Sequence, residues 1–193
     1  MPRAGLTPQA VVREAARLAD EVGYEKLTLA AVAGRLGVAL PSLYKHVRGA
    51  DALGQQLAAL AVAELAAEMT SAAAGRAGRD ALRAVADAWR GYAGRHPGRY
   101  PAAQQVPDPD DPAHVEAGRL ALDAVYAILR GYGLTGDDAV DAARTFRSAV
   151  HGFVTLEASG GFGLPRGMDR SFDQLVAALD TAFRNWPDPV GAR

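Results

Sequence analysis

Residues 28–47, with the sequence TLAAVAGRLGVALPSLYKHV, constrain the fold most, because they contain two short apolar-patterned segments divided by a glycine. Thr28 can cap a helix that turns its apolar residues to one side. Gly37 ends this helix where the chain must turn, and Ala33, four residues earlier, is small enough to let a second helix cross closely. Pro41 suits the first turn of that second helix, where its missing N–H does no harm. The segment therefore predicts two short helices joined by a tight turn.

The second short helix has an apolar face and a polar face. Leu43 and Val47 are four residues apart, so they share one face and can pack on the first helix. The other side presents a hydroxyl, an ammonium and an imidazole, with a tyrosine between the two faces; these residues are Ser42, Lys45, His46 and Tyr44. Such groups suit the major groove of DNA and its phosphates. The spacing alone also fits an ordinary helical hairpin with a polar outer face.

Helical patterns on both sides of the segment favour the DNA-binding interpretation. Thr7–Pro8 is a cap followed by a proline, and apolar residues recur at helical spacing from Val11 until Gly23 closes the helix. After the segment, Asp51 can cap a long apolar-rich helix that runs to about residue 72. The order is therefore one amphipathic helix, two short helices and a long helix.

This order resembles the N-terminal domain of the TetR family of bacterial repressors. The residues that carry the resemblance span about 6–56 and are Leu27-Thr28-Leu29, Val32-Ala33, Leu36-Gly37-Val38, Ser42-Leu43-Tyr44-Lys45-His46-Val47 and Leu53. The resemblance implies that Thr28 meets a phosphate through the start of its helix. It also implies that DNA faces Ser42, Tyr44, Lys45 and His46. Many relatives have a phosphate-binding lysine where this chain has Ala50, so the resemblance implies either fewer phosphate contacts or compensation by Arg48 or by the arm that carries Arg3.

The charge distribution agrees with DNA binding at one end of the protein. The chain has 193 residues and a net charge of −1, which argues against a general nucleic-acid coat protein. Residues 1–50 carry seven basic and four acidic side chains, a balance of +3, which leaves −4 for the remainder. A basic head and an acidic body are typical of a protein that binds DNA through one domain.

The rest of the chain reads as helices separated by loops. Helices are predicted over about 80–95, 110–131, 135–158 and 169–186. The proline-rich stretch 97–112 between them is predicted to be a loop, with one short helix near Ala102–Gln105. No segment alternates as a strand would, so the predicted fold is all-α. We expect an N-terminal three-helix helix-turn-helix domain over 1–50 and a C-terminal helical domain for dimerisation and ligand binding over 51–193.

Several classes of chemistry find no support. The chain has no cysteine, and nothing at its start resembles a signal peptide. The most apolar stretch, 57–67, is short and contains Glu64, so it predicts no membrane span, and a cytoplasmic protein is expected. No nucleophile has a credible base beside it, so we expect no enzyme and no cofactor. The four histidines have no metal-ligand spacing, so no metal site is expected among them.

Two loops superficially resemble binding motifs. Asp108, Asp110 and Asp111 have the side chains that divalent cations prefer, but prolines surround them and a solvated loop explains them more simply. The glycine-rich run 160–163 suggests a phosphate loop only faintly. It follows a predicted helix, no strand precedes it, and the required lysine is absent, so we reject that interpretation.

His151 is the most informative of the histidines. The run Val150-His151-Gly152-Phe153-Val154-Thr155-Leu156-Glu157, with the later Gly161-Phe162-Gly163, resembles the C-terminal domain of one TetR subgroup that is named for a Trp-His-Gly motif. Val150 stands where that tryptophan would be. His151 is then either a satisfied core histidine beside a glycine that permits close packing, or a polar anchor in a ligand cavity.

These observations predict a homodimeric repressor that leaves its operator DNA when a small apolar ligand binds. The expected dimer contact is made by the last two helices, where Phe172, Val176, Leu179 and Phe183 form an apolar stripe that could equally be core. The expected ligand-binding residues are aromatic or polar and lie at helical spacing: Trp89, Tyr92, Tyr126, Phe146, His151 and Phe153. The alternatives are a protein-binding adaptor that keeps the fold, and a small-molecule enzyme.

Overall fold

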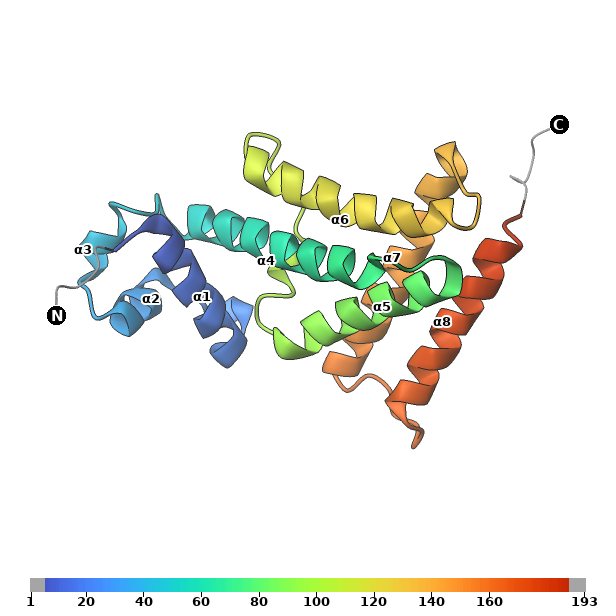
Figure 1. The fold of residues 1–193 in the computed structure, drawn as a ribbon. Helices are drawn as coiled ribbons and strands as arrows, with labels where there is room; N and C mark the ends of the chain where they lie inside the picture. Colours follow the sequence, from blue (N-terminus) through green and yellow to red (C-terminus); the bar gives the residue numbers. More distant parts are fainter. Residues whose placement is uncertain (1–5, 188–193) are drawn as a thin grey trace. The chain divides into compact units, whose positions relative to one another are not determined.

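The computed structural model describes residues 6–187, and this part of the chain contains α-helices and 3-10 turns but no strand (Figure 1). The predicted all-α fold is confirmed. The α-helices are α1 (Pro8–Val22), α2 (Leu29–Leu36), α3 (Leu40–Leu43), α4 (Ala50–Ala73), α5 (Gly78–Arg95), α6 (Pro112–Arg130), α7 (Gly136–Ala158) and α8 (Met168–Arg184). The 3-10 turns are η1 (Tyr24–Lys26) and η2 (Ala102–Gln104). Arg3 lies outside the described residues.

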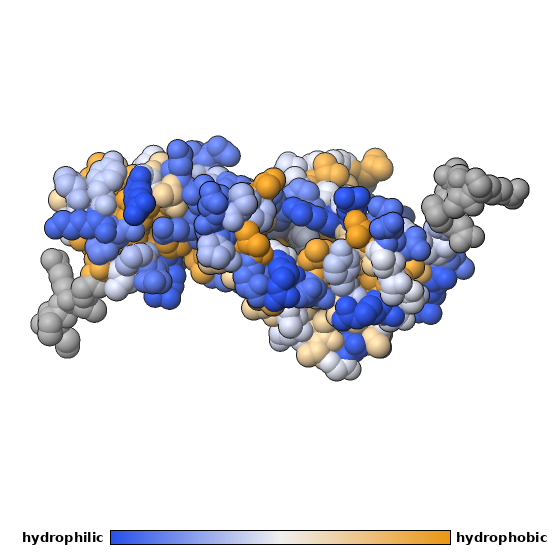
Figure 2. Space-filling view, turned by 90° about the horizontal axis from the view of Figure 1, so that it is seen from above, coloured by the Kyte–Doolittle hydropathy of each residue, from blue (hydrophilic) through white to orange (hydrophobic). Residues whose placement is uncertain are grey.

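The chain divides into two compact units. The first unit contains the chain up to Ala66 together with Arg95–Leu120, and the second contains Ala67–Gly94 together with the chain from Ala121 onward. Each unit is therefore built from two separate stretches of sequence. On the face shown in Figure 2, apolar residues form small patches among hydrophilic ones, as is usual for a surface in contact with water. None of the described helices is long and apolar enough to cross a membrane.

The first unit has a small core beneath α1, α2 and α3. Its buried members are Val11, Val12, Ala15, Leu18, Val32, Ala33, Leu43, Val47 and Leu53. Most of them come from positions that repeat every three or four residues along α1 and α2, because one face of each helix turns inward. This core fixes the short helices against the start of α4.

A network of charged groups holds the end of α1 to the segment that follows α5. Oδ1 of Asp20 accepts a hydrogen bond from the backbone N–H of Arg99 at 2.9 Å, and Nδ1 of His96 lies 3.0 Å from Oδ2 of Asp20. The Arg99 guanidinium is only 10% exposed, and it pairs with Asp20 at 2.8 Å and with Glu64 at 2.9 Å. Gly98 makes this approach possible, because a Cβ there would lie 1.7 Å from the carbonyl oxygen of Ala19.

The apolar stripe of α8 lies in the core of the second unit. Phe172, Val176, Leu179 and Phe183 are all at most 5% exposed within a single chain. The expectation that this stripe faces a partner subunit is therefore wrong, because its side chains already pack against their own chain. Any dimer contact through α7 and α8 must use the other faces of these helices.

An arginine in the second unit joins α5 to α7 and α8. Arg90 makes two hydrogen bonds to the carboxylate of Glu157 and one of 2.8 Å to Asp169. Its guanidinium also lies over the rings of Phe153 and Phe172, 5.6 and 4.9 Å from their centroids. The two acids raise the pKa of Arg90, first through the hydrogen bond to Glu157. Arg90 therefore covers one side of the Phe153 and Phe172 rings.

Candidate nucleic-acid interface

The predicted turn between the two short helices is present in detail. Thr28 caps α2, with its Oγ1 accepting a hydrogen bond from the Ala31 N–H at 3.1 Å. Gly37 has a φ of 65°, in the left-handed region, and ends α2. The N–H of Val38 returns to the carbonyl of Ala33 at 3.1 Å, which satisfies a backbone group at the helix end. The sequence thus sets the turn through one cap and one glycine.

α3 is shorter than a usual recognition helix, since only Leu40–Leu43 are helical. Hydrogen bonds from the N–H groups of His46 and Val47 to the carbonyl of Leu43 continue the chain in turns. Leu43 and Val47 are buried, at 0% and 1% exposure, as their spacing predicted. These two residues anchor the segment to the core of the first unit.

The polar residues predicted to meet DNA are more exposed than this anchor. Thr28, Tyr44, Lys45 and Arg48 are exposed, whereas Ser42 and His46 are half-buried. Tyr44 is 55% exposed, so it lies with the outer residues rather than between the two faces. These six side chains supply two hydroxyls, a phenol, an ammonium, an imidazole and a guanidinium, and none of them is fully buried in the core. These groups can donate to phosphates and base edges.

α2 is also held to α1 by an arginine that the sequence analysis did not single out. Arg35 donates a 2.7 Å hydrogen bond to Glu21 and a 3.3 Å hydrogen bond to Glu14. The Arg35 guanidinium lowers the pKa of Glu21 through this hydrogen bond. Both acids lie on α1 and seven residues apart, so one guanidinium can reach both. The seven-residue spacing of the two glutamates is visible in the sequence. Nothing in the sequence marks Arg35, 14 residues after Glu21, as their partner.

The six residues predicted to bind a ligand all lie in the second unit. Trp89, Tyr92, Phe146 and Phe153 are buried, and the rings of Trp89 and Phe146 meet edge to face at 6.0 Å. Phe153 packs 5.0 Å from Phe172, which belongs to the α8 stripe. Four of the six side chains are therefore buried in the interior of the second unit, which we call its aromatic core, while Tyr126 and His151 are half-buried.

His151 lies on α7 at the margin of this core. Partial burial lowers its pKa, and the charge of Arg147, one turn earlier on the same helix, lowers it further. The imidazole therefore favours its neutral form, which can both donate and accept a hydrogen bond.

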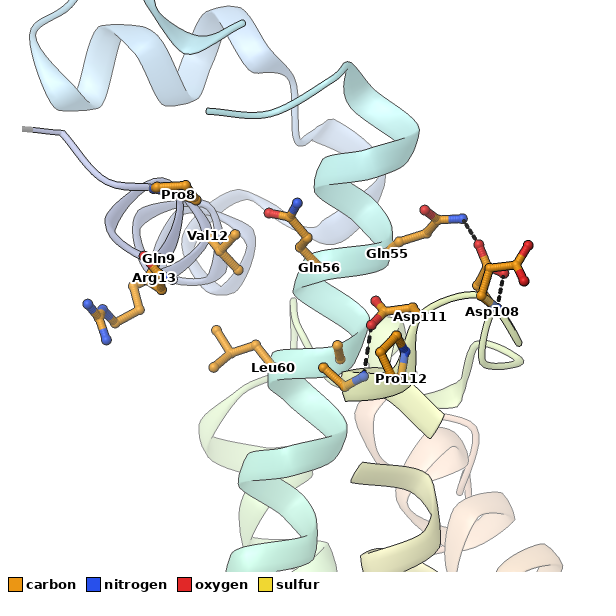
Figure 3. Close-up of a pocket in the computed structure, with 13 residues that line it drawn as sticks. Pro8, Gln9, Val12, Arg13, Gln55, Gln56, Leu60, Asp108, Asp111 and Pro112 are labelled. Carbon is orange, nitrogen blue, oxygen red and sulfur yellow. Dashed lines mark hydrogen bonds between the residues drawn. The ribbon is translucent and has the colours of Figure 1, made fainter. Parts of the chain in front are cut away.

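Two of the three aspartates in the loop before α6, Asp108 and Asp111, accept hydrogen bonds from a glutamine and from backbone N–H groups (Figure 3). Asp111 caps α6, with Oδ1 accepting from the N–H groups of Ala113 and His114 at 3.0 and 3.2 Å. Asp108 accepts a hydrogen bond from Gln55 at 3.1 Å. Across residues 6–187, no cluster of three or more histidine or acidic side chains has an arrangement that could hold a metal ion. These carboxylates therefore organise the loop that leads into α6.

Two family models match this chain. The model described as "Bacterial regulatory proteins, tetR family" matches residues 11–54, and the model "Tetracyclin repressor-like, C-terminal domain" matches residues 82–179. The first match includes the whole candidate interface up to the start of α4. The second includes the packed aromatic core.

Known proteins agree with these matches. An uncharacterised HTH-type transcriptional regulator of Mycobacterium tuberculosis is 40% identical over 158 residues, which cover 81% of this chain and 72% of that protein. A second one, from Bacillus subtilis, is 33% identical over 83% of this chain and 84% of its own length. A TetR variant from Acinetobacter baumannii, crystallised in complex with minocycline, has a TM-score of 0.72 and 26% identity, covering 95% of this chain and 99% of that one.

Proposed function

Because the chain belongs to the TetR family of bacterial transcriptional regulators, we propose that it represses transcription by binding operator DNA as a homodimer and that a small apolar ligand releases it. The observation that carries the proposal is the division of residues 42–48 into two sides. Leu43 and Val47 are buried, while Tyr44, Lys45 and Arg48 are exposed. A buried anchor beneath a polar ridge is what a recognition segment needs to enter a major groove.

We assign DNA binding to residues 1–50 and dimerisation with ligand binding to residues 51–193. In this assignment Thr28, Lys45 and Arg48 bind phosphates, since all three are exposed and carry a hydroxyl or a positive charge. Ser42, Tyr44 and His46 meet base edges or the sugar-phosphate backbone beside them. A dimer would bring two such segments to successive major grooves on one side of the DNA, about 34 Å apart.

The proposed dimer contact uses the outward faces of α7 and α8. Besides charged side chains such as Arg144 and Asp173, the exposed residues of these helices include small or uncharged ones, which are Ser148, Thr155, Gln174, Ala178 and Thr181. Small side chains allow the backbones of neighbouring helices to approach closely.

The proposed ligand site lies among Trp89, Tyr92, Tyr126, Phe146, His151 and Phe153. The aromatic character of this core supports an apolar ligand, and the neutral form of His151 supports a polar contact without a buried charge. Four of these residues are packed in the core, so a ligand must part their rings when it enters. The resulting rearrangement is the source of the proposed coupling to DNA.

Substitution of the two lysines of this chain tests the DNA interface directly. Lys45→Ala should weaken binding to every duplex and flatten the plot of log affinity against log salt by about one unit, because one phosphate contact is lost. Lys26→Ala is the matched control, since Lys26 is also exposed but lies on η1, outside the helix-turn-helix. Titration of DNA from upstream of the gene at several salt concentrations provides the measurement. If both variants bind like the wild-type protein, Lys45 is not in the interface.

Ligand release has a separate test. Apolar and aromatic compounds are screened for those that raise the melting temperature of the protein. Each such compound should lower the affinity of the protein for its operator by about 5- to 150-fold, which corresponds to the usual coupling free energy of ~1–3 kcal/mol. Compounds that bind tightly and leave operator affinity unchanged would exclude the release mechanism and favour the protein-binding adaptor.

A further inference from the structure

The lysines of this chain carry a reactivity that the proposed function does not use. The chain has 21 basic residues, of which only Lys26 and Lys45 are lysines. An arginine stays protonated, whereas a lysine amine can lose its proton and attack an acyl group, which removes its charge. Both lysines are exposed, and within residues 6–187 neither ammonium forms an ion pair or a hydrogen bond. The chain therefore exposes two amines that can react, and they differ in their surroundings.

Lys45 shares a helical turn with a hydroxyl and an imidazole. The N–H of His46 bonds the carbonyl of Leu43 at 2.8 Å, so the chain makes a further turn beyond the end of α3. Ser42, Lys45 and His46 occupy positions i, i+3 and i+4, and side chains at such positions are neighbours on a helical turn. Lys45 is exposed, and the other two are half-buried. A hydroxyl, an amine and an imidazole therefore come together at the edge of the first unit.

The same segment supplies a group that binds anions. Arg48 lies three residues after Lys45, is exposed, and has no acidic partner in the described part of the chain. A guanidinium binds phosphate oxygens through a planar fork of N–H donors. The imidazole of His46 makes no hydrogen bond within residues 6–187, so it is free to accept a proton. Lys45 thus has an anion-binding group and a proton acceptor within three positions.

The other lysine has neither of these groups. Glu25 precedes Lys26, and positions 22–30 contain no other basic side chain. The local charge repels an anionic acyl donor at Lys26 and attracts one at Lys45. Because the two amines are otherwise alike and both exposed, Lys26 serves as a control within the same molecule.

We propose that Lys45 is an acylation site whose donor is a small acyl phosphate. The phosphoryl group of the donor lies against Arg48. The unprotonated amine of Lys45 attacks the acyl carbon, so that a C–N bond forms and the C–O bond to phosphate breaks. Inorganic phosphate leaves with the electron pair of the broken bond, and the amine proton passes to the imidazole of His46. The product is an uncharged amide.

The consequence for DNA binding rests on the proposed function, which gives Lys45 and Arg48 to phosphates of DNA. A surface that holds a DNA phosphate beside an amine also holds the phosphoryl group of an acyl phosphate there, with the acyl group near the amine. Acylated Lys45 has no charge to pair with a phosphate. The affinity for every duplex should then fall, and the salt dependence should flatten by about one unit of slope.

Acetyl phosphate is the probe for this site. The full chain is incubated with it, and mass spectrometry of the peptides follows acetylation at each lysine with time. Lys45 should react at least about fivefold faster than Lys26, as expected when one partly exposed charge pair holds the donor. Equal rates at the two lysines would overturn the proposal.

A donor without a phosphoryl group separates anion binding from simple exposure. The N-hydroxysuccinimide ester of acetic acid transfers the same acetyl group but carries no phosphate. The preference for Lys45 over Lys26 should be smaller with this ester by at least about threefold, because Arg48 no longer holds the donor. An equal preference with both donors would refute the acyl phosphate site, since exposure alone would then explain the reaction.

Variants test the two helper groups. Arg48→Gln should slow acetylation of Lys45 by acetyl phosphate about fivefold. Arg13→Gln is the matched control, because Arg13 is also exposed and unpaired among the described residues but lies on α1. If the two variants react alike, Arg48 does not hold the donor and the proposal is wrong. His46→Gln should slow the reaction of Lys45 with both donors, and an unchanged rate would exclude the proton transfer to His46.

DNA binding is measured separately on the treated proteins. Wild-type protein treated with acetyl phosphate should bind duplex DNA more weakly, whereas Lys45→Arg, which keeps the charge and cannot be acylated in this way, should bind as before treatment. An equal loss in both would refute the effect of acylation on DNA binding. The mass measurement uses no DNA, so failure of the acylation site leaves the proposed DNA function untouched. If Lys45→Ala binds DNA like the wild-type protein, the proposed DNA contact fails and a selective acetylation still stands.

Discussion

Substitution of Gly98 by alanine should destabilise the first unit severely. Gly98 lies in the segment that follows α5, and its Cα faces the end of α1. An added Cβ would lie 1.7 Å from the carbonyl oxygen of Ala19 and 2.5 Å from the backbone nitrogen of Asp20. These atoms belong to a helix backbone, so no side-chain rotation can relieve the clash.

The size of the effect follows from what must move. Ordinary contact needs about 3.5 Å, so the two backbones must separate by roughly 2 Å. This displacement would break the 2.9 Å hydrogen bond from the Arg99 N–H to Asp20 and the 3.0 Å contact between His96 and Asp20. A hydrogen bond to a charged group contributes about 1.5–3 kcal/mol, and partial relaxation retains some of it. We expect Gly98→Ala to lower the free energy of unfolding by about 2–4 kcal/mol.

Urea unfolding of Gly98→Ala and Gly94→Ala at one protein concentration provides the assay. Gly94 is exposed on α5, and nothing lies within 4 Å of an added Cβ there. Alanine at that position should therefore stabilise the helix by about 0.5–1 kcal/mol. The two substitutions make the same chemical change four residues apart, and they should move the unfolding midpoint in opposite directions. A Gly98→Ala midpoint equal to that of the wild-type protein would refute the close approach.

Three further predictions concern other parts of the chain. Arg90→Ala should lower the free energy of unfolding by about 1–3 kcal/mol, because it leaves buried aromatic faces and a carboxylate without their partner. Arg144→Ala, whose side chain is 76% exposed, should change it by less than about 0.5 kcal/mol in the same urea assay. Gly37→Ala should cost about 1 kcal/mol, because its φ of 65° strains any residue with a Cβ; an unchanged midpoint would show that the turn adapts. His151 has a pKa lowered below its ordinary 6.5, so below about pH 6.5 the unfolded chain takes up the proton more readily. Stability should therefore fall as the pH drops from 7 toward 5, and the fall should be shallower in His151→Gln; parallel pH curves of the two proteins would exclude this contribution.

Local signals in the sequence predicted the helix-turn-helix well. The caps at Thr7 and Thr28, the glycine at Gly37, and the anchors Leu43 and Val47 all act within a few residues of their own position. Because periodicity and capping are local, the bounds of the longer helices also lie within two residues or so of the predicted ones.

The stripe on α8 shows where such reasoning fails. Phe172, Val176 and Phe183 repeat at helical spacing, and this pattern is the same whether the face meets its own chain or a second one. α6 shows the reverse case, since Val115 and Leu122 are apolar and yet both are more than 40% exposed. Only the packing of the whole chain decides between these outcomes.

Contacts between distant parts of the sequence were also invisible. Asp20 and Arg99 are 79 residues apart, and nothing near either residue indicates the other. Gly98 follows a proline, in a stretch that the sequence predicts only as a loop. Its actual role depends on a helix that ends 76 residues earlier.

The discontinuity of the first unit has a consequence for biosynthesis. The chain is made from its N-terminus, yet the unit that carries α1, α2 and α3 also needs Arg95–Leu120. Asp20 accepts a hydrogen bond from Arg99, and the Tyr24 hydroxyl accepts one from Gln105. When α3 leaves the ribosome, neither Arg99 nor Gln105 has been translated. The core between α1, α2 and α3 can form earlier, but the unit completes its contacts only after Arg95–Leu120 has emerged, and a nascent chain stalled before that point would lack the bonds of Asp20 and Tyr24 to that stretch.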